Sequence, residues 1–70
     1  MSERFSASQQ AVFDQIDEKT FWAIASAHRT ELQRGAGEAA AFEAALTVLS
    51  HRFPMISRRA MAVITEAIVA

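Results

Sequence analysis

The longest helical pattern of hydrophobic and polar positions covers residues 39–53. Its larger apolar residues recur every three or four positions, which places them on one face of a helix. This face consists of Phe42, Ala45, Leu46, Leu49 and Phe53. The other side carries Glu43, Thr47 and Ser50. Because amphipathic segments flank this region in the sequence, the pattern predicts a central core helix on which the rest of the chain packs.

Both ends of this central helix carry recognisable signals. Glu38 lies at its start, and His51 and Arg52 lie in its last turn, so the charges at both ends suit the helix dipole. Pro54 lacks an amide hydrogen and disfavours helical geometry in the residue before it, so the helix has to stop there. Ser57 is placed to cap a following helix. The sequence therefore predicts a tight corner followed by a last helix.

The last helix has an unusually wide apolar arc. One side consists of Ala60, Met61, Ile64, Ala67 and Ile68. The other side consists of Arg58, Ala62, Thr65 and Glu66. Val63 and Val69 widen the arc beyond what one neighbouring helix would cover. We therefore expect residues 56–69 to drive self-association.

A first helix is predicted to begin near Ala7, because Ser6 and Gln9 have the spacing of a capping box. Its apolar face consists of Ala11, Val12, Phe13 and Ile16. Polar residues on the other side, Gln10, Asp14 and Asp17, are expected to point to water.

Residues 17–20 allow two interpretations. Asp17 or Thr20 can cap a new helix that begins at Phe21, or one helix can continue over residues 7–34. The good helix formers in this stretch favour continuity, whereas the drift of the apolar face around the helix favours an interruption. We expect a break or a kink here.

The next predicted helix has one face that recurs at helical spacing, formed by Phe21, Ile24, Ala25, His28 and Leu32. Gly35 ends it, because glycine accepts the left-handed conformation that often closes a helix. The loop over residues 35–37 is so short that the flanking helices become antiparallel neighbours. Small residues recur every four positions on both helices, at Ala23, Ala27, Gly37, Ala41 and Ala45, and predict a close approach. The chain is expected to be all-α, a compact bundle of three or four short helices forming one domain over residues 1–70.

The composition points to a partner protein. A chain of 70 residues buries only about 60–65 % of the surface that its unfolded form exposes, and small domains often need a partner chain. Hydrophobic residues make up 51 % of it, which predicts apolar surface buried against another subunit. The net charge of −1 provides no overall field that would draw the chain to nucleic acid or to an anionic membrane.

The chain contains no cysteine, which excludes disulfides and thiolate metal sites and fits a reducing compartment. Its polar start carries no secretory signal, and no uncharged apolar run of about 18 residues is present to span a bilayer. We expect a cytoplasmic protein without membrane contact.

Catalytic groups are scarce. With no cysteine, no tyrosine and two histidines, His28 and His51, the sequence lacks a base beside a nucleophile. His28 and Glu31 share one helix face, but di-iron bundles use the opposite order, Glu then His, with further carboxylates from other helices. We expect no enzymatic activity, no cofactor and no metal, and a half-buried structural role for His28.

Basic residues flank the corner at Pro54, namely His51, Arg52, Arg58 and Arg59. This arrangement loosely matches a helix-turn-helix, in which a corner joins two helices and the second helix reads DNA in the major groove. Here the arginines lie in the first turn of that second helix. The sequence has few basic residues to neutralise phosphates, and its corner lacks a glycine. These features favour helix capping and salt bridges to a protein, with a small DNA-binding regulator as the alternative.

Trp22 lies about 100° round the helix from Phe21, which we expect to face inward. The pattern favours packing of Trp22 under the first helix over a role as a partner anchor, although Trp is common among interface hot spots. The predicted function is a small non-catalytic interaction module, such as an adaptor, an inhibitor or an accessory subunit. The candidate partner-binding residues are Trp22, His51, Arg52, Met55, Arg58 and Arg59.

Overall fold

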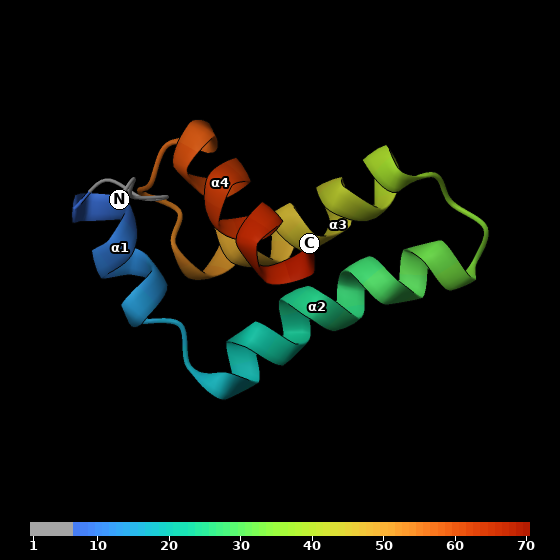
Figure 1. The fold of residues 1–70 in the computed structure, drawn as a ribbon, viewed down its shortest axis with the longest axis horizontal. Helices are drawn as coiled ribbons and strands as arrows, with labels where there is room; N and C mark the ends of the chain where they lie inside the picture. The colour runs from blue at the N-terminus through green and yellow to red at the C-terminus, as the bar shows by residue number, and fades with distance from the viewer. Residues whose placement is uncertain (1–6) are drawn as a thin grey trace.

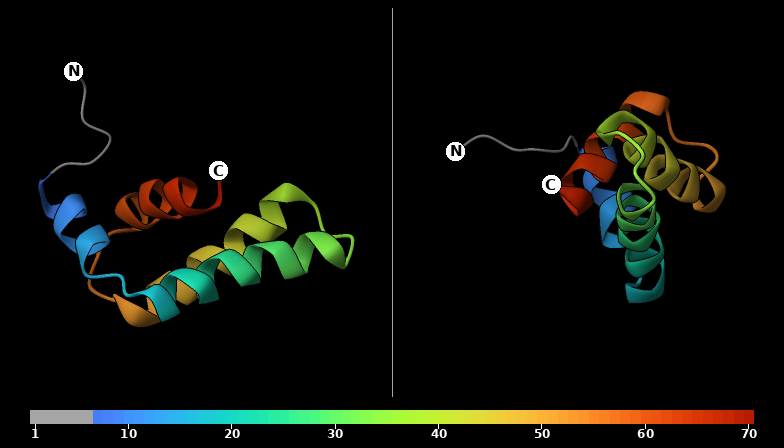
Figure 2. Two further views of the ribbon diagram at one scale, coloured as in Figure 1. Left: turned by 60° about the horizontal axis from the view of Figure 1, so that its bottom comes forward. Right: turned by 90° about the vertical axis from the view of Figure 1, so that its right-hand side faces the viewer.

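Two antiparallel helices, α2 (Glu18–Gln33) and α3 (Glu38–Arg52), form a hairpin on which the other helices rest (Figure 1). The computed structural model describes residues 7–70, with side chains from residue 9 onward. Over this range the chain forms four helices and no strand: α1 (Ala7–Asp14), α2 (Glu18–Gln33), α3 (Glu38–Arg52) and α4 (Arg58–Val69). Helix α4 lies on the hairpin, and α1 stands at the end where α2 begins and α3 ends (Figure 2). The predicted all-α bundle is confirmed.

The break between α1 and α2 depends on Asp17. Its Oδ1 accepts a hydrogen bond of 2.8 Å from the backbone N–H of Thr20, which caps the start of α2. Hydrogen bonding from Thr20 lowers the pKa of the Asp17 carboxyl below its usual value, and the positive charge of Arg52 lowers this pKa further. The predicted break is confirmed, but the new helix begins at Glu18 rather than at Phe21.

A second local signal ends α2 at Gly35. This residue has a φ of +91°, which a residue with a side chain rarely adopts. Its N–H donates to the Leu32 carbonyl at 3.0 Å, and the N–H of Ala36 donates to the Glu31 carbonyl at 3.0 Å. This pair of bonds is the Schellman closure, which turns the chain sharply into α3.

Side chains from three helices form the centre of the core, which consists of Ile24, Ala45, Leu49 and Ile64. The central helix is confirmed, because the buried residues of α3 include three of its predicted apolar face, Ala45, Leu46 and Leu49. The other two members of that face are half-buried.

The small residues of α3 also pack as predicted, since Ala41 and Ala45 are fully buried. On α2 the prediction is partly wrong: Ala27 is half-buried, but Ala23 is exposed. The reason is the rotation of α2, which turns Thr20 and Ile24 into the bundle. Ala23, about 100° from Ile24, is therefore turned away.

Thr65 on α4 contradicts the predicted polar side of that helix, because it is fully buried. Helix α4 contacts α1, α2 and α3, so it is covered on more than one side. The Thr65 hydroxyl finds no hydrogen-bond partner among the described residues. A buried hydroxyl without a partner costs free energy, so this position is a weak point of the core.

Helix α1 is short and comes close to only one other helix, α4. Ile16 lies beyond the end of α1, not on its face as predicted, yet it is half-buried and packs against the core. Gln10 Nε2 donates to Asp14 Oδ1 at 2.8 Å along the outer side of the helix. The predicted cap at Ser6 lies outside the described residues.

Leu49→Ala is expected to lower the free energy of unfolding by about 2–5 kcal/mol, because it leaves a cavity at the centre of the core. Thr47→Ala is the matched control on the same helix. Thr47 is exposed, and its hydroxyl donates only to the carbonyl of Glu43, so the control should change stability little. Urea unfolding measures the free energy of unfolding of both variants. Equal losses in the two variants would contradict the burial of Leu49 at the centre of the core.

Thr65→Val is expected to raise the free energy of unfolding by about 1 kcal/mol, because valine has a similar shape and removes the unpaired hydroxyl. Thr30→Val is the control, since Thr30 is exposed in the C-terminal half of α2. A destabilised Thr65→Val in thermal or urea unfolding would mean that the hydroxyl has a partner in solution.

Candidate protein-binding surfaces

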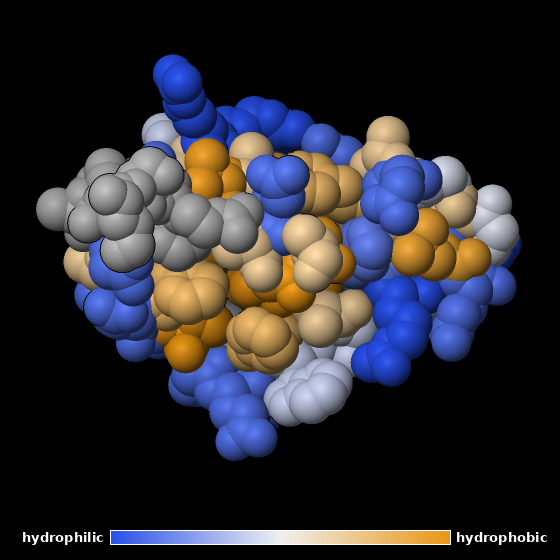
Figure 3. All heavy atoms as spheres, viewed as in Figure 1, coloured by the Kyte–Doolittle hydropathy of each residue, from blue (hydrophilic) through white to orange (hydrophobic). Residues whose placement is uncertain are grey.

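The exposed large apolar side chains of the described residues are Phe21, Trp22, Leu32 and Met55. Three of them lie on α2 and one lies at the corner before α4, whereas no large apolar residue of α4 is exposed. Figure 3 shows apolar surface over α4 and its neighbours in the middle of one face, with polar residues around it. The larger apolar residues on the outer part of α4, Met61, Val63, Ile68 and Val69, are half-buried, so the other helices cover this arc only in part. Self-association through residues 56–69 stays a prediction.

The corner after α3 is built from local signals. Phe53 leaves the helix with a φ of −133°, as the following proline requires. The backbone then turns, and the N–H of Ile56 donates to the Phe53 carbonyl at 3.3 Å. Ser57 Oγ accepts a hydrogen bond of 3.1 Å from the N–H of Ala60, which confirms the predicted cap of α4.

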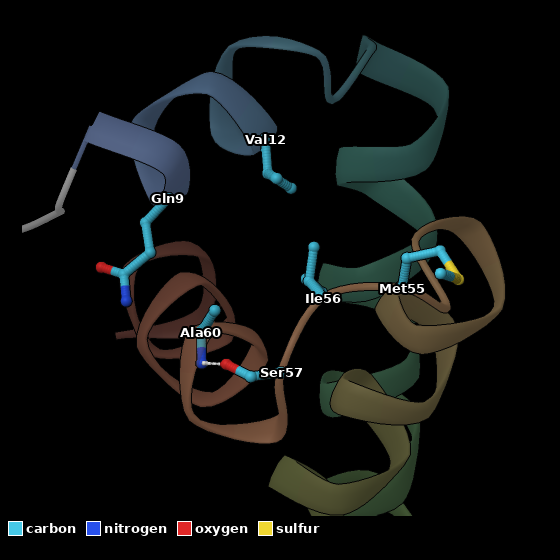
Figure 4. Close-up of a pocket in the computed structure, with 6 residues that line it drawn as sticks. All are labelled: Gln9, Val12, Met55, Ile56, Ser57 and Ala60. Atoms are coloured by element: carbon cyan, nitrogen blue, oxygen red, sulfur yellow. Dashed lines mark hydrogen bonds between the residues drawn. The ribbon is translucent and has the colours of Figure 1, made fainter.

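Met55 is 94 % exposed at this corner, while Ile56 beside it packs against the core. Next to Met55 a pocket of about 260 Å³ opens between α1 and the start of α4 (Figure 4). It is lined by Gln9, Val12, Met55, Ile56, Ser57 and Ala60. Val12 and Ile56 point into the space from opposite sides. The pocket can accept an apolar side chain, and none of its described lining residues is titratable.

The four basic residues around the corner are not equally available. Arg58 Nη2 lies 2.6 Å from Glu43 Oε2 on α3, and Arg52 lies near enough to Asp17 to lower its pKa. His51 and Arg59 are exposed and make no ion pair within the described part of the chain. Among the described residues, Arg58 is therefore the one member of this cluster that an ion pair holds. Sequence reasoning missed Glu43 because it is distant along the chain.

Trp22 is 53 % exposed, so the prediction that it packs under the first helix is wrong. Its ring meets that of Phe21 edge to face, with centroids 6.3 Å apart. Phe21, expected to face inward, is itself partly exposed at the rim of the bundle. Because α2 and α3 are antiparallel, Trp22 lies at the same end of the hairpin as Arg52 and the corner (Figure 1).

His28 on α2 pairs with a carboxylate of α3. Its side chain is 13 % exposed, and its Nε2 lies 3.3 Å from Glu38 Oε1 at the start of α3. Glu31, considered above as its metal-binding companion, is instead paired with Arg34 at 3.3 Å. The described residues contain no group of three His, Asp or Glu side chains that could hold a metal ion.

No family model, curated protein or solved structure matches this chain. Among the described helices, none combines the length and the apolar character that crossing a bilayer requires.

Arg58→Glu combined with Arg59→Glu is expected to change the free energy of unfolding by less than about 1 kcal/mol. The exposed Arg58–Glu43 pair contributes little, and carboxylates suit the N-terminus of α4. Arg59→Glu alone is the control that keeps this pair. Urea unfolding measures stability, and a loss of several kcal/mol in the double variant would contradict the exposed setting of the pair.

Proposed function

We propose that the chain is a small non-catalytic protein-interaction module, an adaptor, inhibitor or accessory subunit, which buries apolar helix surface against itself or a larger protein. The observation that carries this proposal is the exposed Met55 beside an apolar pocket. Burying a Met side chain that was exposed contributes about 1.5–3 kcal/mol. Flexible Met side chains are also common at binding surfaces that adapt to a partner.

The small core supports the same proposal. Only three large hydrophobic side chains, Ile24, Leu49 and Ile64, are fully buried among the described residues. A bundle of this size gains stability from any partner that binds its folded state, because binding shifts the folding equilibrium by mass action. Association would therefore contribute to stability as well as to function.

None of the described residues that line the pocket is titratable, which supports a binding role rather than a catalytic one. Among the two histidines, His28 is already held by Glu38. Cytoplasmic location remains a prediction, based on the lack of cysteine.

The DNA-binding alternative has less support. Arg58 is paired with Glu43, which leaves Arg52 and Arg59 as the arginines of the corner without an ion pair among the described residues, and these are few for neutralising phosphates. Titration of the wild-type chain with duplex DNA at low salt separates the two classes. Binding that weakens steeply with salt, and that is lost in the double Arg58→Glu, Arg59→Glu variant, would favour the regulator.

The proposal is tested by sedimentation of the purified chain over a wide concentration range, combined with capture of partners from the source cell. Met55→Ser should weaken the association by about tenfold if the corner is the binding surface. Leu32→Ser is the matched control, since it removes an exposed apolar side chain near the other end of α2.

A chain that stays monomeric at every concentration and captures no protein at stoichiometric level would contradict the proposal. Association that survives Met55→Ser would keep the interaction role and move its surface away from the corner.

A further inference from the structure

The outer face of α2 carries a stripe of four residues on which none of the other described helices packs. The residues Glu18, Trp22, Ala25 and Arg29 follow one another at spacings of four, three and four positions. This spacing matches the 3.5-residue repeat of a coiled coil, with apolar Trp22 and Ala25 in the middle and a charged residue at each end. The stripe lies roughly opposite the buried Thr20 and Ile24, and its members are exposed except for Ala25, which is half-buried. Figure 1 shows α2 along one edge of the molecule, with no helix on its outer side.

From this stripe we propose that a second copy of the chain docks against the outer face of α2, with the two α2 helices antiparallel. The inference rests on the proposed function and names its partner and its surface. It commits to self-association because the charges of the stripe complement those of an inverted copy.

The charge order decides the direction of pairing. A two-fold axis that crosses α2 between residues 23 and 24 places Glu18 about 8 Å to one side and Arg29 about 8 Å to the other. Glu18 of each copy then lies level with Arg29 of the other, which gives two symmetric ion pairs. A parallel arrangement would instead place like charges opposite each other, which opposes association.

The same axis also places the large side chain of the stripe opposite small ones. Trp22 of one copy lies level with Ala25 and Ser26 of the other, which form the floor of a hole that a large knob can enter. Trp22 is the only tryptophan in the chain and is half exposed, so it has apolar area left to bury. Tryptophan is among the residues most often found to dominate binding energy.

Glu18 and Arg29 have no competing partners in the monomer. They lie about 16 Å apart along the helix, too far to meet each other. Both are exposed, and neither makes an ion pair or a side-chain hydrogen bond within the described residues. Their charges therefore remain available to a second copy.

The test is a charge swap measured by sedimentation at low salt. Glu18→Arg alone and Arg29→Glu alone should each raise the dissociation constant about tenfold, because each change turns two attractive pairs into repulsive ones. The double variant, which combines Glu18→Arg with Arg29→Glu, should return the dissociation constant close to the wild-type value. Trp22→Ser should raise it at least tenfold in either charge background.

Arg34→Glu is the control for Arg29→Glu, because it makes the same charge change at an exposed residue at the end of α2 that lies outside the stripe. It should leave the dissociation constant within about twofold of wild type. Circular dichroism confirms that each variant folds, and if Glu18→Arg weakens the start of α2, Arg29→Glu and Trp22→Ser still decide the question.

A wild-type chain that dimerises while the swap fails to restore binding, or while Trp22→Ser binds as wild type, overturns this inference and leaves the interaction role standing. A strictly monomeric wild type also overturns it, and the proposed function then depends on capture of a different protein. The proposed function and this inference are both contradicted only if the wild-type chain stays monomeric and captures no protein.

Discussion

The close contact between α2 and α3 is the interaction on which the rest of the structure depends. Ala41 and Ala45 are fully buried, so no large side chain holds the two helices apart at these positions. The contact is closed at the loop by the Schellman bonds around Gly35 and by the His28–Glu38 pair. Helix α4 then completes the core with Ile64, and α1 adds half-buried side chains at one end. With so few fully buried large residues, this hairpin holds much of the stability of the bundle.

The same contact determines what the protein presents to its surroundings. Because Thr20 and Ile24 are buried, and Ile24 belongs to the core cluster with residues of α3 and α4, the rotation of α2 is fixed and Trp22 has to point outward. The corner at Pro54 likewise determines which side chains are exposed after α3, because Ile56 packs against the core and Met55 points outward. Packing of the core thus places the exposed apolar side chains on α2 and at the corner. The proposed interaction role, and the proposed pairing of α2 with a second copy, both follow from this placement.

Features that depend on neighbouring residues were predictable from the sequence. The stop at Pro54, the cap at Ser57 and the left-handed Gly35 each result from chemistry within a few residues, and all three are confirmed. Features that depend on contacts between helices were not. The burial of Thr65, the exposure of Trp22 and the pairing of Arg58 with Glu43 follow from which helices cover which faces, and a periodic pattern carries no such information. For the candidate site, the sequence therefore proposed residues that are exposed in the structure, such as Met55 and Arg59, but did not reveal that Arg58 is paired with Glu43.

The most direct test of the account uses the fluorescence of Trp22, because the chain contains no other tryptophan. Its emission is recorded while the protein concentration is raised, and the mass is followed in parallel by sedimentation. If α2 pairs with a second copy, emission shifts to shorter wavelength as the mass doubles, and both transitions have the same midpoint. A doubling of mass without a change in emission would contradict the account, because Trp22 would then remain in water while the chain associates through another surface.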